Sequence, residues 1–431
     1  MKKTLIFFLL CGISLLSANG QSEIEYSHEE NGASRMLKRM SDNQKYAVGT
    51  DSYKTAFIWD LETGEVRTYP SADMELNLKA EDISDNGIVA GMHLEKPAML
   101  IDGVWEELPL PEGALSAYPQ SITRDGSKIA GSASYSGYMS KPVIWENGEC
   151  RILDYPAKVN GFGDVVQAKI KDMSGDGTIL VGNLFDRMSI QMACVWRAPL
   201  YECEVFSVEA CGSTYMNCFA ARISNNGEWV TGPITAKQGN QTYSYRYNIK
   251  EDVFEIIFDL QTPYGGSCID NDGTIFTYTS PSGMPGMIGR TAYIQRPGEK
   301  SQNLFEHMLA DFEIDMNLMS KSCTVMDVAD NENLFAGFGM DETGRISGFL
   351  VRNNIANSIV QLEPKNEPLI LIDNILTVSA QNPDIRIYSA TGKLVRKTSQ
   401  TSVDLNNLQA GIYVVTVMQE GKITCKKIVI Q

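Results

Sequence analysis

The chain has 431 residues, of which 43% are hydrophobic; 37 are Lys or Arg and 53 are Asp or Glu, so the formal net charge is −16 at pH 7. This length suits one large repeat domain and one smaller domain, each with its own core. Phosphate recognition requires concentrated positive charge, and the sequence has no basic stripe. We therefore expect no nucleic-acid partner.

The N-terminal segment has the pattern of a signal peptide. In MKKTLIFFLLCGISLLSANG, two lysines precede an apolar run, and the small residues Ala18 and Gly20 precede Gln21,. We expect residues 1–20 to be a signal peptide that is removed on export. Bulky residues before Cys11 argue against lipoprotein processing. No other stretch has the 18 or more consecutive apolar residues of a membrane span, so none is predicted.

One short motif recurs along the chain. Each copy contains an apolar residue, a Ser or Thr, an Asn-Gly or Asp-Gly turn and a second apolar run that ends in Gly. The four clear copies are AEDISDNGIVAG (80–91), PQSITRDGSKIAG (119–131), IKDMSGDGTILVG (170–182) and AARISNNGEWVTG (220–232). Weaker copies lie at 38–49, 267–278 and 325–337. The spacing of roughly 40–50 residues, with one longer step before the last copy, is typical of propeller blades.

Each copy is followed by two more β-rich runs with tight turns between them, as in KPVIWENGECRIL,. The prediction is an all-β chain in which residues 21–360 form a seven-bladed β-propeller, with each motif supplying the two inner strands of a blade. Gly87 is expected to adopt a positive φ in its turn. The segment after Gln21, or residues 358–362, is expected to complete an outer strand. Over about residues 38–352 the motifs resemble the HAF-type repeats of secreted propellers, a resemblance that implies fold and not activity.

Three segments supply candidate ligand-binding residues. TYSYRYN (242–248) places three tyrosines on one face of a strand, which suits either stacking on a sugar or, as we favour, packing between blades. The connections DYPAKVNGFGDV (154–165) and SPSGMPGMIG (280–289) are long, so we expect surface loops there and look to them first for ligand contacts. The candidate residues are Tyr243, Tyr245, Tyr247, Phe162, Met284 and Met287.

The sequence contains no recognisable catalytic or metal motif, and we predict no cofactor and no metal. Three histidines are too few for a His-rich metal site,. The aspartates of the turns fail the EF-hand spacing, so Asp85, Asp125, Asp176 and Asp272 are interpreted as turn residues. Gly-x-Ser-x-Gly, His-Glu-x-x-His and P-loop motifs are absent from the sequence. Paired carboxylates for glycoside chemistry are a property of the fold that spacing does not reveal.

Nine cysteines occur, one of them in residues 1–20. In an exported protein the other eight either form disulfides or act as buried thiols. Cys203, Cys211 and Cys218 are spaced closely enough to bridge one local loop. Both interpretations remain open.

The last third of the chain changes character twice. SQNLFEHMLADFEIDMNLMS (301–320) has apolar residues at helical spacing and predicts a short amphipathic helix,. QLEPKNEP, included in residues 361–368, predicts a linker, and residues 369–431 alternate as expected for a small Ig-like β-sandwich,.

The C-terminal strands carry a second resemblance. IRIYSATGKLV (385–395), VDLNNLQAGIYVVTV (403–417) and GKITCKKIVIQ (421–431) resemble, in order, the motifs of the type IX secretion C-terminal sorting domain. The resemblance implies type IX machinery as a partner of residues 369–431 and delivery to the surface or exterior of a diderm bacterium. The alternative is an ordinary Ig-like accessory module.

The functional expectation is an exported, non-enzymatic binding module that uses propeller loops to hold a glycan or protein ligand. The alternative is a polysaccharide- or peptide-degrading hydrolase or lyase with its site at a propeller mouth. Carboxylates or a histidine clustered in the central funnel would favour the enzyme. A smooth polar channel with mobile rim loops would favour binding.

Overall fold

The computed structural model divides the chain into two units, Glu23–Asn353 and a second unit of Met1–Ser22 with Asn354–Gln431. The signal-peptide segment 1–20, the linker 361–368, Met284 and Met287 lie outside the described residues. In the part that is described, no helix is long and apolar enough to cross a membrane. The structure describes residues 23–27, 35–51, 55–70, 79–160, 162–206, 215–237, 241–261, 266–280, 289–316, 319–329, 334–352, 369–372, 375–378, 384–389, 393–408, 411–419 and 422–430.

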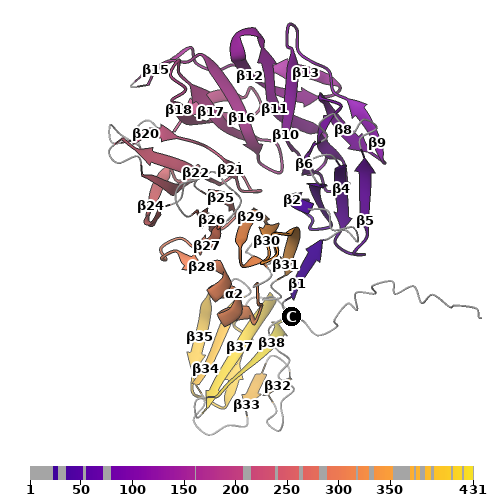
Figure 1. Cartoon of the computed structure of the whole chain (residues 1–431). Helices are drawn as coiled ribbons and strands as arrows, with labels where there is room; N and C mark the ends of the chain where they lie inside the picture. The colour runs from indigo at the N-terminus through magenta and orange to yellow at the C-terminus, as the bar shows by residue number, and fades with distance from the viewer. Residues whose placement is uncertain are drawn as a thin grey trace, which may run out of the picture. The chain divides into compact units, whose positions relative to one another are not determined.

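Seven antiparallel sheets make up most of the larger unit and follow one another in chain order around a common centre (Figure 1). In the first four, strands adjacent in sequence pair with each other. The first sheet has β2 (Arg35–Met40), β3 (Tyr46–Asp51), β4 (Thr55–Asp60) and β5 (Val66–Pro70). The second has β6 (Lys79–Ile83), β7 (Val89–His93), β8 (Lys96–Ile101) and β9 (Val104–Glu107). The third has β10 (Ser116–Ile122), β11 (Lys128–Tyr135), β12 (Met139–Glu146) and β13 (Glu149–Ile152), and the fourth has β16 (Gln167–Met173), β17 (Ile179–Phe185), β18 (Gln191–Arg197) and β19 (Glu202–Val205).

The remaining sheets vary this plan. In the fifth the inner strand is split in two, and both halves pair with β22. It has β20 (Tyr215–Cys218), β21 (Arg222–Ile223), β22 (Trp229–Ala236), β23 (Thr242–Asn248) and β24 (Val253–Gln261). The sixth has β25 (Gly266–Ile269), β26 (Ile275–Thr279), β27 (Thr291–Gln295) and β28 (Gln302–Asn303). The seventh has β29 (Ser322–Val328), β30 (Leu334–Met340), β31 (Ile346–Arg352) and β1 (Glu23–Ser27).

The sheets form a closed cycle. Each contacts the next in chain order, and the seventh contacts the first, through the strand pairs β3–β6, β7–β10, β12–β16, β18–β20, β22–β25, β25–β29 and β30–β2. The first strand of the chain is also the outer strand of the last sheet, because β1 pairs antiparallel with β31 over five residue pairs from Glu23–Arg352 to Ser27–Gly348. Of the two segments predicted to complete an outer strand, the one after Gln21 is confirmed, and residues 358–362 lie outside the described residues.

A bulge and a glycine explain the end of each motif. The register of the first and second strands shifts by one residue, for example between Pro119 and Ser121 of β10. The bulged backbone approaches the second strand so closely that a Cβ at the motif's final glycine would overlap a carbonyl oxygen; at Gly131 that oxygen belongs to Tyr118,. The same overlap with a carbonyl oxygen of the first strand occurs at Gly49, Gly91, Gly182, Gly232 and Gly337. The sixth sheet differs, because its glycine, Gly266, lies on the first strand, opposite Thr277 of the second.

The polar residues of the motif build its turn. In the third sheet the Thr123 hydroxyl donates to Asp125 Oδ1 (2.7 Å) and accepts from the Lys128 N–H (3.0 Å). Hydrogen bonds from the Ser127 N–H and the Thr123 hydroxyl lower the pKa of Asp125 to about 2,. The turn role predicted for this aspartate is confirmed. Gly87 has φ +83°, as expected for its turn,.

Short elements outside the sheets fill the longer connections. They are η1 (Ser136–Tyr138), the hairpin of β14 (Lys158–Val159) and β15 (Gly163–Asp164), and α2 (Leu304–Phe312). Helix α2 lies within the predicted segment 301–320, and its start is capped by the Asn303 side chain, which accepts from the N–H groups of Phe305 and Glu306,. Leu304 and Met308 are buried in the core between the sixth and seventh sheets.

The smaller unit contains two sheets with one shared core. Nine buried residues form this core, from Leu376 of β33 to Val417 of β37. The three-stranded sheet has β32 (Leu369–Ile372), β33 (Ile375–Val378) and β36 (Ser402–Asp404); the four-stranded sheet has β34 (Asp384–Ser389), β35 (Leu394–Thr398), β37 (Gly411–Gln419) and β38 (Lys422–Ile430).

Candidate functional site

In each of the seven sheets, the strand that carries the first apolar residue of the motif is the inner strand. Each inner strand presents one equivalent residue at the centre of the cycle. This residue immediately precedes the apolar residue of the motif, at or just after the bulge. We call the set the axial residues: Arg39, Asp82, Ser121, Asp172, Arg222, Cys268 and Asp327. Five of the seven carry a charge, three negative and two positive.

Arg39 crosses the centre and connects sheets that are distant in sequence. Its Nη2 forms an ion pair with Asp172 Oδ1 of the fourth sheet, and its Nη1 lies 3.4 Å from Asp327 Oδ1 of the seventh. Arg39 and Asp172 are 7% and 1% exposed. Because the first sheet reaches the fourth through one side chain, side chains fill the centre of the cycle.

The axial carboxylates also join each sheet to the next. Asp82 Oδ2 accepts from the N–H of Ile122 (2.9 Å) and the hydroxyl of Ser121 (2.8 Å), both in the following sheet. Asp172 Oδ2 accepts in the same way from Ile223 N–H (3.1 Å). These carboxylates therefore act first as connectors between inner strands.

The bond at the seventh sheet closes the cycle. Asp327 Oδ2 accepts from the Met40 N–H (2.7 Å) of the first sheet. The Asp327 side chain thus joins two segments separated by 287 residues.

Burial and charge act in opposite directions at these groups. Burial raises the pKa of Asp82 to about 6, although Arg39 opposes the shift, and burial likewise raises the pKa of Asp327,. Burial alone would lower the pKa of Arg39, but Asp172, Asp82 and Asp327 outweigh it and raise that pKa. The Arg39 guanidinium is therefore charged at neutral pH, and Asp82 and Asp327 are the carboxyl groups whose pKa burial raises.

A small cavity of about 20 Å³ lies among these residues and the adjoining turns. Asp42 and Arg124, in the turns of the first and third sheets, form an ion pair there, with 3.1 Å between Asp42 Oδ2 and Arg124 Nη2. Burial raises the pKa of Asp42 to about 7, against the opposing charge of Arg124,. A Cβ at Gly175 would overlap the ends of both side chains, so a larger residue there would displace the pair. The volume suits a single water molecule.

The turns around this mouth are tied to one another. The Asn43 N–H donates to Asp85 Oδ1 (2.7 Å), the Arg124 N–H donates to Gly175 O (2.9 Å), and the Gly175 N–H donates to Asn225 O (3.0 Å). These bonds hold successive turns in register at this end of the sheets.

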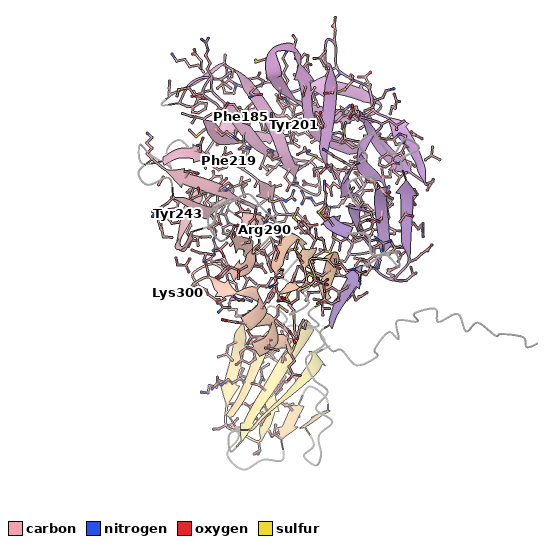
Figure 2. The ribbon with its side chains drawn as sticks, in the orientation of Figure 1. Phe185, Tyr201, Phe219, Tyr243, Arg290 and Lys300 are labelled. Carbon is pink, nitrogen blue, oxygen red and sulfur yellow. The ribbon has the colours of Figure 1, made fainter. Side chains whose placement is uncertain are left out.

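The three predicted tyrosines lie on β23 but differ in their surroundings. Tyr245 and Tyr247 are buried; Tyr245 donates to Phe219 O (2.7 Å), and Tyr247 stacks on Phe206 with 4.3 Å between ring centroids. Tyr243 is half-buried and meets Phe258 edge-on at 5.4 Å (Figure 2). Only Tyr243 of the three has a substantial accessible surface.

The predicted loop 154–165 contains the hairpin β14–β15 and is largely exposed. Phe162 itself is half-buried and packs with Tyr155 and Val159 against the core of the fourth sheet. Of the predicted site residues that the structure describes, none belongs to the axial set. Within the described ranges, no group of three or more His, Cys, Asp or Glu side chains is placed to hold a metal ion.

The axial residues were not among the predicted site residues, although aligned repeats contain their signal. A charged or polar side chain precedes the apolar residue in six of the seven copies, and Cys268 does so in the sixth. Such a residue in an otherwise β-rich inner strand points toward a polar centre. Which partners meet there depends on closure of the cycle.

Comparisons with known proteins give a family for the C-terminal residues and similar solved structures for most of the chain. Residues 364–431 match the secretion system C-terminal sorting domain. An oligogalacturonate lyase in complex with manganese has a TM-score of 0.51 and 8% identity, covering 78% of this chain and 98% of that chain. The oligogalacturonate lyase of Vibrio parahaemolyticus has a TM-score of 0.50 and 10% identity, covering 77% and 97%. The β-propeller domain of the Trilobed protease from Pyrococcus furiosus has a TM-score of 0.46 and 12% identity, covering 75% and 94%.

No curated protein sequence is significantly similar to the chain. At these identities the solved structures show the fold alone. The larger unit has a propeller-like all-β fold, and residues 364–431 are a type IX sorting domain, which indicates export to the cell surface or exterior of a diderm bacterium.

Proposed function

We propose that this chain is an exported seven-bladed β-propeller that binds a glycan or protein ligand through the loops at one end of its blades. In this proposal residues 1–20 are a signal peptide, residues 21–360 the propeller, 361–368 a linker, and 369–431 a sorting β-sandwich. The closed cycle of sheets supports the blade count, since each sheet lies between two neighbours,. The core shared by its two sheets supports the sandwich,.

The observation that carries the binding proposal is a difference between the two ends of the blades. In a meander, turns between strands one and two lie at one end, and the connections between sheets lie at the other. The first end is tied together by the hydrogen bonds between turns. The second end, which we call the loop end, carries the long connections; Leu115 (71% exposed), Tyr118 of β10 (43%) and Met188 (80%) present apolar side chains near it. Apolar side chains are also exposed at the first end, as at Leu200 (71%), so the long loops over a rigid scaffold are the feature that supports ligand recognition at the loop end,.

The axial carboxylates are held in hydrogen bonds that acid–base catalysis would have to break. Asp82, Asp172 and Asp327 each accept at least one backbone N–H from the following sheet. A general acid or base must exchange its proton with substrate, and these bonds would have to break first. Their clustering in the centre therefore does not by itself indicate an enzyme.

A second candidate function rests on Asp42. A half-buried carboxylate with a pKa of about 7, beside the Arg124 guanidinium at a cavity mouth, has the properties of a general acid or base,. Lyase or hydrolase chemistry on a polysaccharide or peptide would use this pair. Turnover of polygalacturonate or casein that is lost in Asp42→Asn would favour this function over binding.

A binding test uses residues 21–431 on glycan and protein arrays. The expected result is a hit whose affinity falls at least tenfold in Tyr118→Ser or Leu115→Ser. The matched control is Val104→Ser, which removes a side chain that is 62% exposed on the outer strand β9 and should leave affinity unchanged. Tyr243→Ser tests the sugar-stacking tyrosine separately.

Three results would contradict the proposal. The first is no hit on either array; the second is a hit that the loop-end variants leave unchanged; the third is equal loss in the Val104 control. Loss of binding only in variants of the Asp42–Arg124 pair would move the site to the opposite mouth.

A further inference from the structure

The fourth sheet brings two cysteines together across its outer strands. β18 pairs antiparallel with β19, and the register places Cys194 opposite Val205 and Trp196 opposite Cys203. Residues two apart on a strand face the same side, so Cys194 and Cys203 are diagonal neighbours on one face. Their connection, residues 198–201, includes Tyr201 (Figure 2).

The two thiols are close enough to interact. After burial, the Cys203 side chain is the next cause that raises the pKa of Cys194. Both pack in the core between the third and fourth sheets, where Cys194 is fully buried and Cys203 is half-buried. Diagonal cysteines lie farther apart than directly opposite ones, so bringing sulfur to sulfur takes rotation of the side chains together with a small shift of the edge strand β19,.

The geometry points to a disulfide between Cys194 and Cys203 that forms after export and fixes the outer strand of the fourth sheet. The sorting domain places the mature protein outside the reducing cytosol, where disulfides persist,. The inference rests on the export in the proposed function and is independent of ligand binding, so failure to bind a ligand leaves it intact and absence of the disulfide leaves the binding proposal intact.

The chemistry balances with a disulfide-type thiol oxidant of the exported compartment. The half-exposed Cys203 thiolate attacks the oxidant's disulfide, which forms a mixed disulfide and releases one oxidant thiol. The Cys194 thiolate then attacks Cys203 Sγ, which forms the internal disulfide and releases the second oxidant thiol. The two cysteines lose two electrons and two protons, and the oxidant is reduced to a dithiol. Burial raises the pKa of Cys194 and so lowers its thiolate fraction, which is why the more accessible Cys203 takes the first step and Cys194 only the second, intramolecular one,.

Other described cysteines are placed differently. Cys218 packs in the core on the opposite side of the fourth sheet, so that sheet separates it from Cys203. Cys150 holds the position of Cys203 in the third sheet, opposite Trp145, but the position of Cys194 is there occupied by Val143. Cys150 is therefore a matched control with the same strand position and no neighbouring thiol on β12. Cys211 lies outside the described residues.

The test uses folded residues 21–431, reduced and then exposed to oxidised glutathione at neutral pH. Free thiols are alkylated after an acid quench, and the protein is cleaved after Arg and Glu. We expect a disulfide-linked pair of peptides, Met188–Arg197 joined to the fragment that contains Cys203, which separates Cys203 from Cys211 and Cys218. Cys203→Ser and Cys194→Val should abolish this product, and Cys150→Ser should leave it unchanged. Valine is chosen because the third sheet has it at the equivalent position.

Oxidation should also raise the Tm of the wild type by about 2–4 °C and leave that of Cys203→Ser unchanged. When the protein is oxidised in urea, the Cys194–Cys203 disulfide should no longer predominate, and disulfides between other pairs of cysteines should form as well. The proposal is overturned if both thiols remain alkylatable after oxidation of the folded protein. It is equally overturned if Cys203 joins Cys211, Cys218 or Cys150, or if the bond lowers the Tm.

Discussion

Replacing Arg39 with Met should destabilise the larger unit more than any other single change to the axial residues. The substitution keeps much of the side-chain volume and removes the guanidinium that meets Asp172 and Asp327 across the centre. Three axial carboxylates then remain in a buried space with one axial cation, Arg222, in place of two. Removing one partner of a buried ion pair costs about 3–5 kcal/mol. We expect the free energy of unfolding at pH 7.5 to fall by about that amount.

The loss should depend on pH in a definite direction. With Arg39 present, the pKa of Asp82 is already about 6, above the ordinary value of 3.8, and without Arg39 it rises further. An acid whose pKa is raised by folding destabilises the fold as pH increases from its unfolded value through its folded value. More of the Asp82 carboxyl is protonated at pH 5 than at pH 7.5, so the loss should be smaller by about 1–2 kcal/mol, since one pKa unit corresponds to about 1.4 kcal/mol,.

The assay is urea unfolding followed by tryptophan fluorescence. All five tryptophans lie in the larger unit, so the signal reports that unit alone. The control is Arg67→Met, which removes an exposed ion pair with Glu65 and should cause no measurable change,. A loss for Arg39→Met below about 1 kcal/mol, or one that grows as pH is lowered, would refute the electrostatic account of the centre.

Three further predictions concern the inner strands and the closure. Gly131→Ala should lower the free energy of unfolding by about 1–3 kcal/mol, because its Cβ would overlap the Tyr118 carbonyl; an unchanged urea midpoint would disprove the close approach,. Asp42→Asn should flatten the decline in stability between about pH 4 and pH 7, because its carboxylate has a folded pKa of about 7; a pH profile parallel to wild type would contradict this,. Deleting residues 21–27 should lower the Tm and expose the seventh sheet to trypsin, since β1 pairs with β31 along its length; wild-type resistance would show that β1 does not close the cycle.

The repeats predicted much of the fold because their information is local. Alternating apolar runs and Asn-Gly or Asp-Gly turns determine hairpins, and four such runs per copy determine a sheet. The helix at Leu304–Phe312 followed from its apolar spacing, whereas the Asn303 cap that begins it was not predicted,. Even the final glycine of each motif was visible, although its cause, a bulged carbonyl on the neighbouring strand, was not.

The axial network could not be predicted in the same way. Arg39, Asp172 and Asp327 are far apart in sequence and come together only when the cycle of sheets closes. Similarly, alternation predicted that Tyr243, Tyr245 and Tyr247 share a strand face, but their exposure depends on how the fifth sheet packs. The contact of Cys194 with Cys203 depends on the register of β18 and β19, which the sequence left open.

Surface delivery tests the central claim most directly: that this is an exported propeller whose C-terminal unit determines its destination. The full chain, a deletion of residues 421–431 and a fusion of residues 361–431 to an unrelated exported protein are expressed in a bacterium with type IX machinery. Deleting β38 removes the strand paired with β37 over nine residue pairs, so the sorting unit should fail while the propeller folds,. Added protease on intact cells should then cleave the full chain and the fusion and spare the deletion, which stays in the periplasm. Cleavage of the deletion on intact cells, or protection of the fusion, would contradict the account.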